Sequence, residues 1–436
     1  MADLLALSAR FIDGGIYEGP AAVNRVTTEL SEVADDVAVV EAFSHVVAFA
    51  TAEGLVVFDT SLEVFAGAIT AGLRKWRSDP FHTIAYTHGH VDHVGGAAAF
   101  VEDAERRGDR PPRIVGHEAL PARFARYRQT NGYNAVVNAR QFGGGRPVPG
   151  IGAMAEGGSQ RFGPARWIEP DTTFRDRLRL RVADLDFELH HAKGETDDHL
   201  WAWVPRRQAI CAGDFVTWVF PNAGNPQKVQ RYPLEWAAAL REMAAKDAEL
   251  LLPAHGLPVG GRERVRALLL DLASALESLV EQCLALMNQG RRLDALLHEV
   301  RLPDALLAKP YLRPVYDEPE FVVRNVWRLY GGWYDGNPAH LKPASERALA
   351  VEVAKLAGGA PALVQRAREL ATAGELRLAC ELVEWAALAA EDDAGVHGAR
   401  AEIYTERRRQ ELSLMARGIY GDAARQSAAV ARGGPD

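Results

Sequence analysis

The run YTHGHVDHVGG, residues 86–96, places three histidines and one aspartate within His88 to His93. A helix aligns only residues three or four apart, such as His90 and His93, so a single helix cannot bring all four side chains to one point. The preceding run FHTIAYTH has the aromatic and β-branched character of a buried strand. The glycines that follow indicate a turn into a helix, GGAAAFVEDAERRG. The run therefore predicts a metal centre at the carboxyl end of a strand, where open α/β sheets place their sites.

The rest of the chain shows two patterns that change near residue 260. Before that point, strand-like runs such as VTTELSEV, DDVAVVEAF, HVVAFAT and GLVVFDT alternate with helical periodicity. Beyond it, Ala, Leu, Glu and Arg recur at helical spacing almost to the end. We expect a catalytic domain over 1–262, a helical domain over 263–425 and a frayed tail over 426–436. Residues 117–170 show no clear period, and we interpret them as an irregular insertion over the site.

Composition excludes several classes of function. The formal net charge of −8 leaves no basic excess to displace phosphate counterions, which argues against a nucleic-acid partner. The three cysteines lie far apart and form no CxxC pair, so they indicate neither a disulfide framework nor a thiolate zinc site. No signal peptide or apolar run long enough to span a bilayer is recognisable, so we expect a cytoplasmic protein without a membrane span.

The histidine-rich run exceeds what one ion requires. A catalytic zinc takes three protein ligands and leaves one position open. We therefore expect two clusters, His88 with His90 and Asp92 with His93, each completed by distant ligands.

Three distant residues follow strand-like runs and can complete these clusters. Glu195 lies in a glycine turn, KGETDDH, where Asp197, Asp198 and His199 are alternatives. Asp214 ends AICAGDF, and His255 ends LLLPAHG. A carboxylate at Asp214 is able to bridge two cations about 3.5–4 Å apart, the usual spacing in two-metal hydrolases. We interpret His117, His190 and His191 as structural histidines.

The order of these motifs resembles the metallo-β-lactamase superfamily over residues 25–262. The HxHxDH run, the glycine turn, the GD strand end and the PAHG strand end all follow its pattern, and Asp59 matches its buried aspartate beside the ligand loop. Two further segments resemble type III alkyl sulfatases: residues 311–341 are similar to their dimerisation region, and 116–143 to their insertion.

These resemblances imply an αββα sandwich followed by an all-α dimerisation domain, and hence a homodimer. They imply two zinc ions, with manganese or iron as alternatives. His88, His90 and Glu195 would bind one ion, Asp92, His93 and His255 the other, and Asp214 both. The implied activity is hydrolysis of a small alkyl sulfate or related ester, anionic with an apolar tail, by a metal-activated water that Asp92 orients.

The chain also departs from the alkyl sulfatases. Their bridging glutamate is Asp214 here, and their His/Asn-rich stretch with an arginine is replaced by FVTWVFPNAGNPQKVQRYP. From a sequence that ends at residue 436, we expect no counterpart of their sterol-carrier-like domain. The candidates for contacting substrate are Tyr133, Asn134, Arg140, Lys228 and Arg231.

Other functions stay open at this point. The same scaffold serves hydrolysis of a lactone, amide or phosphoester. An iron-dependent redox enzyme is a further alternative, although no flavin or sulfur-transfer domain is evident. A catalytically silent assembly protein would be expected to have lost ligands, and here every expected ligand is present.

Overall fold

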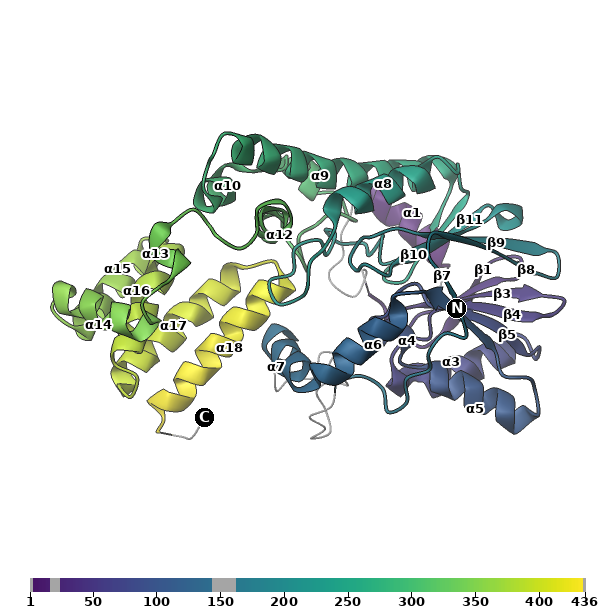
Figure 1. The fold of residues 1–436 in the computed structure, drawn as a ribbon, viewed down its shortest axis with the longest axis horizontal. Coiled ribbons are helices and arrows are strands. Elements are labelled where there is room, and N and C mark those ends of the chain that lie inside the picture. The colour runs from purple at the N-terminus through teal and green to yellow at the C-terminus, as the bar shows by residue number, and fades with distance from the viewer. Residues whose placement is uncertain (1–2, 16–23, 143–161, 434–436) are drawn as a thin grey trace. The chain divides into compact units, whose positions relative to one another are not determined.

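The computed structural model describes residues 3–15, 24–142 and 162–433. The chain forms two compact units. The first comprises Met1–Ala135 and Pro147–Gly332, and the second comprises Val136–Arg146 and Trp333–Asp436. The first unit contains both β-sheets and all the expected metal ligands (Figure 1).

The first sheet has seven strands in sequential order, built from the Val-, Ile- and Phe-rich runs of the first half of the chain. Neighbouring strands are antiparallel from β1 to β4 and parallel from β4 to β7. The strands are β1 (Leu30–Ala34), β2 (Val37–Val40), β3 (Val46–Thr51), β4 (Gly54–Phe58), β5 (Phe81–Ala85), β6 (Arg113–His117) and β7 (Thr172–Phe174).

The second sheet has six strands in the order β13-β12-β11-β10-β9-β8. Its pairs are antiparallel except β11 with β12, which are parallel with Ile210 opposite Leu251. The strands are β8 (Arg177–Val182), β9 (Leu185–His191), β10 (Leu200–Val204), β11 (Ala209–Gly213), β12 (Leu250–Pro253) and β13 (Val259–Gly260), with a 3₁₀ turn, η2 (Pro205–Arg207), between β10 and β11.

The two sheets pack face to face over an apolar core. Phe187 of the second sheet meets Phe49 and Phe58 of the first at ring-centroid distances of 5.4 and 6.1 Å. Helices cover the outer faces: α3 (Glu63–Trp76) and α5 (Ala97–Arg107) lie on the first sheet, and α1 (Leu4–Gly14), α8 (Pro233–Ala244) and α9 (Arg262–Asn288) on the second (Figure 1). The predicted αββα sandwich is confirmed.

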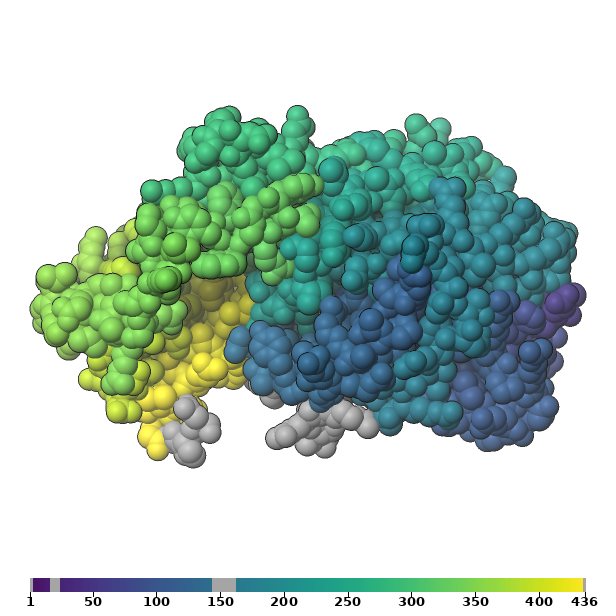
Figure 2. All heavy atoms as spheres, viewed as in Figure 1, coloured from purple at the N-terminus to yellow at the C-terminus, as the bar shows by residue number. Residues whose placement is uncertain are grey.

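The prediction that residues 117–170 form an irregular insertion is wrong for its first part. Two helices, α6 (Leu120–Gln129) and α7 (Asn131–Phe142), follow β6, and α6 is visible on the surface of the first unit in Figure 2. Helix α6 buries Leu120, Phe124 and Tyr127 at helical spacing. Arginines interspersed among these residues hid the period, because a buried arginine breaks the apolar pattern. Residues 143–161 of the predicted insertion lie outside the described residues.

Helices after residue 262 also belong to the first unit. Helix α12 (Pro319–Gly331) packs on α9 and α10 (Leu293–Glu299), and the short helix α11 (Asp304–Leu307) precedes it. The sequence pattern changes near residue 262, whereas the compact unit continues to Gly332.

The second unit is helical, as expected. Its Ala-rich core joins residues such as Ala367, Val383 and Ile403. The prediction of a frayed tail from residue 426 is wrong up to Ala431, because α18 continues to that residue and buries Ser427. Among the described residues, no helix has the length and apolar character that crossing a bilayer requires. The helices are α13 (Pro338–Leu341), α14 (Glu346–Ala357), α15 (Ala360–Thr372), α16 (Leu376–Ala389), α17 (Ala394–Gln410) and α18 (Leu414–Ala431).

Candidate metal centre

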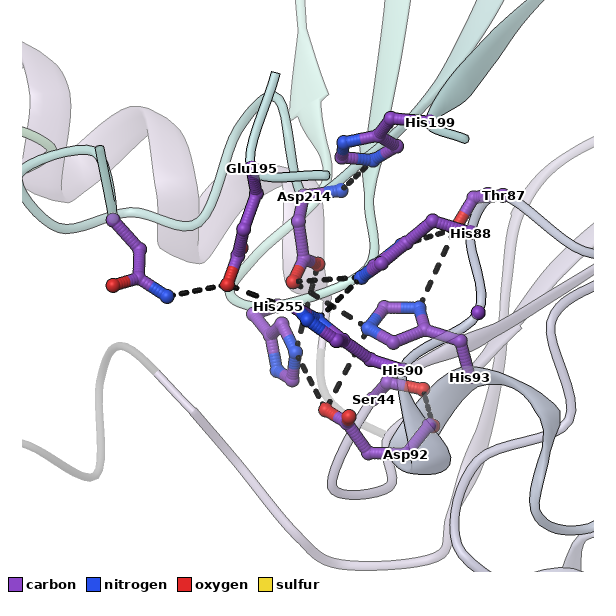
Figure 3. Close-up of polar contacts among 12 residues, drawn as sticks. Ser44, Thr87, His88, His90, Asp92, His93, Glu195, His199, Asp214 and His255 are labelled. Atoms are coloured by element: carbon purple, nitrogen blue, oxygen red, sulfur yellow. Dashed lines mark hydrogen bonds and ion pairs between the residues drawn. The ribbon is translucent and has the colours of Figure 1, made fainter. Parts of the chain in front are cut away.

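The two sheets bring the ends of several strands to one place in the first unit. His88 follows β5, Asp214 follows β11 and His255 follows β12, and Glu195 lies in the turn between β9 and β10. His90 precedes the single-turn helix α4 (Val91–Val94), which carries Asp92 and His93. Side chains from segments far apart in sequence therefore point toward a common centre (Figure 3).

The predicted ligands form two groups of potential donor atoms. His88, His90, Glu195 and Asp214 make one group, and Asp92, His93 and His255 make the other. Within each group, the donor atoms all lie within 4.8 Å of one another. Nε2 of His88 and Nδ1 of His90 face each other at 2.7 Å, as two ring nitrogens turned toward the same point.

Asp214 lies between the two groups. Its Oδ2 is 3.8 Å from Nε2 of His88 and 3.4 Å from Nε2 of His93, and its Oδ1 is 3.6 Å from Nε2 of His255. Asp92 approaches the second group, with Oδ2 at 3.5 Å from Nε2 of His93 and 3.3 Å from Nε2 of His255. One carboxylate is thus within reach of donors from both groups.

The electrostatics of the centre favour a cation. Burial acts to raise the pKa of Asp214, but His93 and His255 hold it well below its usual range. Burial acts to lower the pKa of His93, yet the carboxylates of Asp214, Asp59 and Asp92 hold it well above its usual range. The buried Nε2 of His93 and Oδ1 of Asp214 have no hydrogen-bond partner among the described residues. Buried polar atoms nearly always have a hydrogen-bond partner, so two buried atoms without one are suited to metal ligation.

Asp59 braces the motif from the end of β4, as predicted. Its Oδ1 accepts the Thr87 backbone N–H at 2.7 Å, and its Oδ2 accepts the Thr87 hydroxyl at 2.8 Å. The same Oδ2 lies 2.8 Å from Nδ1 of His93. A carboxylate on one ring nitrogen orients the histidine and leaves Nε2 for a metal.

The alternatives to Glu195 in the glycine turn have other partners. Nε2 of His199 accepts the backbone N–H of Asp214 at 3.2 Å, and its ring stacks on Phe215 with centroids 4.2 Å apart. Burial lowers the pKa of His199 to about 3, so the ring is neutral and able to accept. Asp198 is committed to Arg123, with Oδ1 at 2.8 Å from Nε. Asp197 also pairs with Arg123.

Arg123 is a residue that the sequence reasoning missed. It is buried on α6, and its partner Asp198 accepts the backbone N–H of Gly89 at 3.0 Å through Oδ2. Gly89 lies between His88 and His90, and a Cβ there would lie 2.6 Å from Cδ of Arg123. The Arg123–Asp198 pair therefore joins the two ligand loops. The spacing of Leu120, Phe124 and Tyr127 could have indicated the helix, but it does not mark the arginine as buried.

Glu195 meets cationic and amide groups from the segment after β11. Arg231, 1% exposed, directs Nη2 to Oε1 of Glu195 at 3.3 Å, and Nδ2 of Asn222 donates to the same oxygen. Burial raises the pKa of Glu195 to about 8, and Arg231 opposes that rise. Burial lowers the pKa of Lys228 to about 8, and Arg231 lowers it further, while Glu195 and Asp92 act in the opposite direction. Lys228 and Arg231 thus lie near the centre, and Asn222 is a second residue that the sequence reasoning missed.

The other predicted substrate residues are placed differently. Tyr133 is 66% exposed, and the side-chain amide of Asn134 bonds back to Thr130. Arg140 belongs to the second unit, where Nε lies 3.9 Å from Asp422. The structure therefore does not bring Tyr133 and Asn134 into contact with the expected ligands, and a substrate role for Arg140 stays a prediction.

Comparisons with known proteins identify the family. The model of the metallo-β-lactamase superfamily matches residues 39–255, and the model described as alkyl sulfatase dimerisation matches residues 293–429. The chain belongs to the metallo-β-lactamase superfamily. Within it, the chain resembles the alkyl sulfatases through the second matched region.

Curated relatives agree with this assignment. A linear primary-alkylsulfatase of Pseudomonas sp. (strain ATCC 19151) is 29% identical over 353 residues, which cover 78% of this chain and 66% of the relative. An alkyl/aryl-sulfatase of Saccharomyces cerevisiae is 26% identical and covers 76% of this chain. The chain spans 66% of the length of the first relative and 52% of the second.

A solved structure confirms the fold. The stereoselective inverting sec-alkylsulfatase of Pseudomonas sp. superposes with a TM-score of 0.80 at 23% identity, covering 94% of this chain and 66% of that one. The fold of this member of the superfamily is therefore shared over nearly its whole length.

Proposed function

We propose that the protein is a binuclear metal-dependent hydrolase that cleaves alkyl sulfate esters. The observation that carries the proposal is the convergence of two groups of donors from strand ends of both sheets, with Asp214 within reach of both. The names of the relatives support a sulfate ester as the substrate class.

The metal-binding part of the proposal follows from the donor set. His88, His90 and Glu195 would hold one ion, Asp92, His93 and His255 the other, and Asp214 both. Imidazole nitrogens with carboxylate oxygens are a donor set that zinc accepts, and manganese and iron remain alternatives. Divalent ions held by these residues would lower the pKa of a bound water toward about 7 and would offset charge on a leaving oxygen.

The chain's own residues have separate tasks in this proposal. Asp92, beside His93 and His255, orients the attacking water by accepting a hydrogen bond. Asp59 keeps His93 in the tautomer that presents Nε2. Lys228 and Arg231 supply positive charge near Glu195 for an anionic substrate group, in place of the His/Asn-rich stretch of the alkyl sulfatases.

We further propose that two chains form a homodimer through the helical region. The match to the alkyl sulfatase dimerisation model over residues 293–429 supports this. Large apolar side chains of the second unit are exposed, among them Leu356 at 90% and Trp333 at 68%. Contiguous exposed apolar groups mark interaction surfaces, and the proposal expects these side chains to lie at the interface between the two chains. Light scattering after gel filtration tests the proposal, and a mass equal to one chain would contradict it.

The experiment for the activity is sulfate release from dodecyl sulfate, with a p-nitrophenyl carboxylic ester as the parallel substrate. The proposal predicts sulfate release that disappears after chelation and returns when zinc is restored. Cleavage of the carboxylic ester alone would retain the metal hydrolase and reject the sulfatase. Activity unaffected by metal removal would reject the hydrolytic mechanism.

A carboxylic ester is the second candidate substrate. The specific observation behind it is the altered segment after β11, where FVTWVFPNAGNPQKVQRYP replaces the alkyl sulfatases' sulfate-binding stretch. The expected cytoplasmic location of the protein stays a prediction.

A further inference from the structure

We infer that Asp317 and Asn325 are positioning residues of the metal centre. They act through the loop of residues 222–231, which contacts Glu195. Asp317 lies just before α12 and Asn325 lies on it, and both are within the region that matches the alkyl sulfatase dimerisation model. The inference rests on the proposed metal-binding role of Glu195. It assigns part of the region named for dimerisation to the support of the metal centre.

Asp317 holds the start of this loop. It is fully buried, and its Oδ2 accepts the backbone N–H of Gly224 at 2.6 Å and that of Asn225 at 3.1 Å. Its Oδ1 accepts the backbone N–H of Glu318 at 2.7 Å. A buried carboxylate that receives three backbone donors fixes the backbone around it, because losing the acceptor would leave buried donors unpaired.

The fixed loop carries a contact to Glu195. Asn225 donates through Nδ2 to Oδ1 of Asn222 at 3.2 Å, which orients the Asn222 amide. Asn222 in turn donates through Nδ2 to Oε1 of Glu195. A chain of buried hydrogen bonds therefore runs from Asp317 through Asn225 and Asn222 to Glu195.

Asn325 holds the far end of the same segment. Its side chain is 3% exposed, and it pairs with the backbone of Arg231 as a neighbouring strand would. Oδ1 accepts the Arg231 N–H at 3.2 Å, and Nδ2 donates to the Arg231 carbonyl at 3.0 Å. The guanidinium of Arg231 then reaches Oε1 of Glu195 at 3.3 Å. The same carboxylate oxygen thus receives contacts from both clamped ends of the segment.

The loop packs tightly against α12 at Gly224. A Cβ on Gly224 would lie 2.5 Å from the backbone carbon of Phe321 and 2.5 Å from the backbone nitrogen of Val322. Only a glycine permits this approach, so loop and helix keep one fixed register. A shift of α12 would therefore move Asn222 and Arg231 with respect to Glu195.

The test compares the zinc affinity of the full chain and its variants, measured by competition with a chromophoric chelator. Asp317→Ala and Asn325→Ala should each weaken zinc binding about tenfold or more, the range found for outer partners of metal ligands. Asp317→Asn keeps a carbonyl oxygen for Gly224 and Asn225, and it should rescue affinity to within about threefold of wild type. Asp294→Asn, a carboxylate 88% exposed on α10, is the matched control and should leave zinc binding unchanged.

Circular dichroism shows which variants fold, and either alanine variant suffices if the other does not. Wild-type zinc affinity in a folded Asp317→Ala or Asn325→Ala protein would overturn the inference, as would equal losses in Asp317→Asn and Asp317→Ala. Failure of the proposed function and failure of this inference give different results. If wild type binds zinc but hydrolyses no ester, the proposed function is refuted. The zinc affinities of the variants still decide whether Asp317 and Asn325 position the centre. In an active enzyme, the alanine variants should lower kcat at saturating zinc more than they raise KM.

Discussion

Removing the Arg123 guanidinium should destabilise the protein strongly and in a pH-dependent way. Arg123 and Asp198 have side-chain exposures of 3% and 0%, and they lie 2.8 Å apart. Arg123→Met keeps an apolar stem of similar length but leaves the Asp198 carboxylate buried without its cation. Breaking a buried pair from one side costs about 3–5 kcal/mol, so the free energy of unfolding should fall by about that amount.

The pH dependence follows from Asp198. Burial acts to raise its pKa, but Arg123 holds it below its usual value in wild type. That depressed pKa contributes stability above the unfolded-state pKa of about 4, and the contribution is lost as pH falls through the folded-state value. In Arg123→Met the effect of burial loses the guanidinium that opposes it, so the pKa of Asp198 should rise and the carboxyl should protonate more readily. The difference in stability between variant and wild type should therefore narrow from about pH 8 to about pH 5.

Urea denaturation followed by tryptophan fluorescence measures both effects. The matched control is Arg128→Met on the same helix, whose ion pair with Glu169 is 50% exposed on each side. Such surface pairs contribute about 0–1 kcal/mol, so the control should unfold almost like wild type. A loss below about 1 kcal/mol in Arg123→Met, or a loss independent of pH, would refute the reasoning.

Three further predictions concern the same centre. Asp59→Asn should weaken zinc binding about 10–100-fold in chelator competition, because His93 loses the acceptor that fixes its tautomer, and wild-type affinity would contradict this. The KM for an alkyl sulfate should rise as pH increases through about 8, where Lys228 loses its charge. In steady-state kinetics, Lys228→Met should abolish this rise in KM. An identical pH profile of KM in the variant would exclude a role for Lys228 in binding the sulfate. Gly89→Ala should lower stability by about 1–3 kcal/mol in thermal unfolding, because its Cβ would lie 2.6 Å from Arg123 Cδ, whereas an unchanged melting temperature would show that the loop yields.

The expected ligands could be recognised in the sequence because each lies in a short local pattern. His88 to His93 form one run, and Asp214 and His255 each end an apolar strand beside glycine. Parallel neighbours such as β11 and β12 have their carboxyl ends on the same sheet edge, so these strand ends predict that Asp214 and His255 lie close together. The run after β5 lies in the other sheet, and only the packing of the two sheets brings it to the same place.

The supporting residues could not be recognised in this way. Arg123, Asn222 and Asp317 have their roles through partners in distant segments, and nothing local marks an arginine or an aspartate as buried. Helix α6 was missed for a related reason, since buried Arg123 interrupts its apolar stripe. The extension of the first unit to Gly332 depends on α12 packing against α9, which the helical periodicity of α12 does not reveal.

The most direct test of the central claim is an anomalous diffraction map of zinc-loaded crystals, collected at the zinc absorption edge. The account predicts two peaks about 3.5–4 Å apart. One should be coordinated by His88, His90 and Glu195, and the other by Asp92, His93 and His255. Asp214 should contact both. A single peak, or peaks away from these side chains, would contradict a shared two-metal centre.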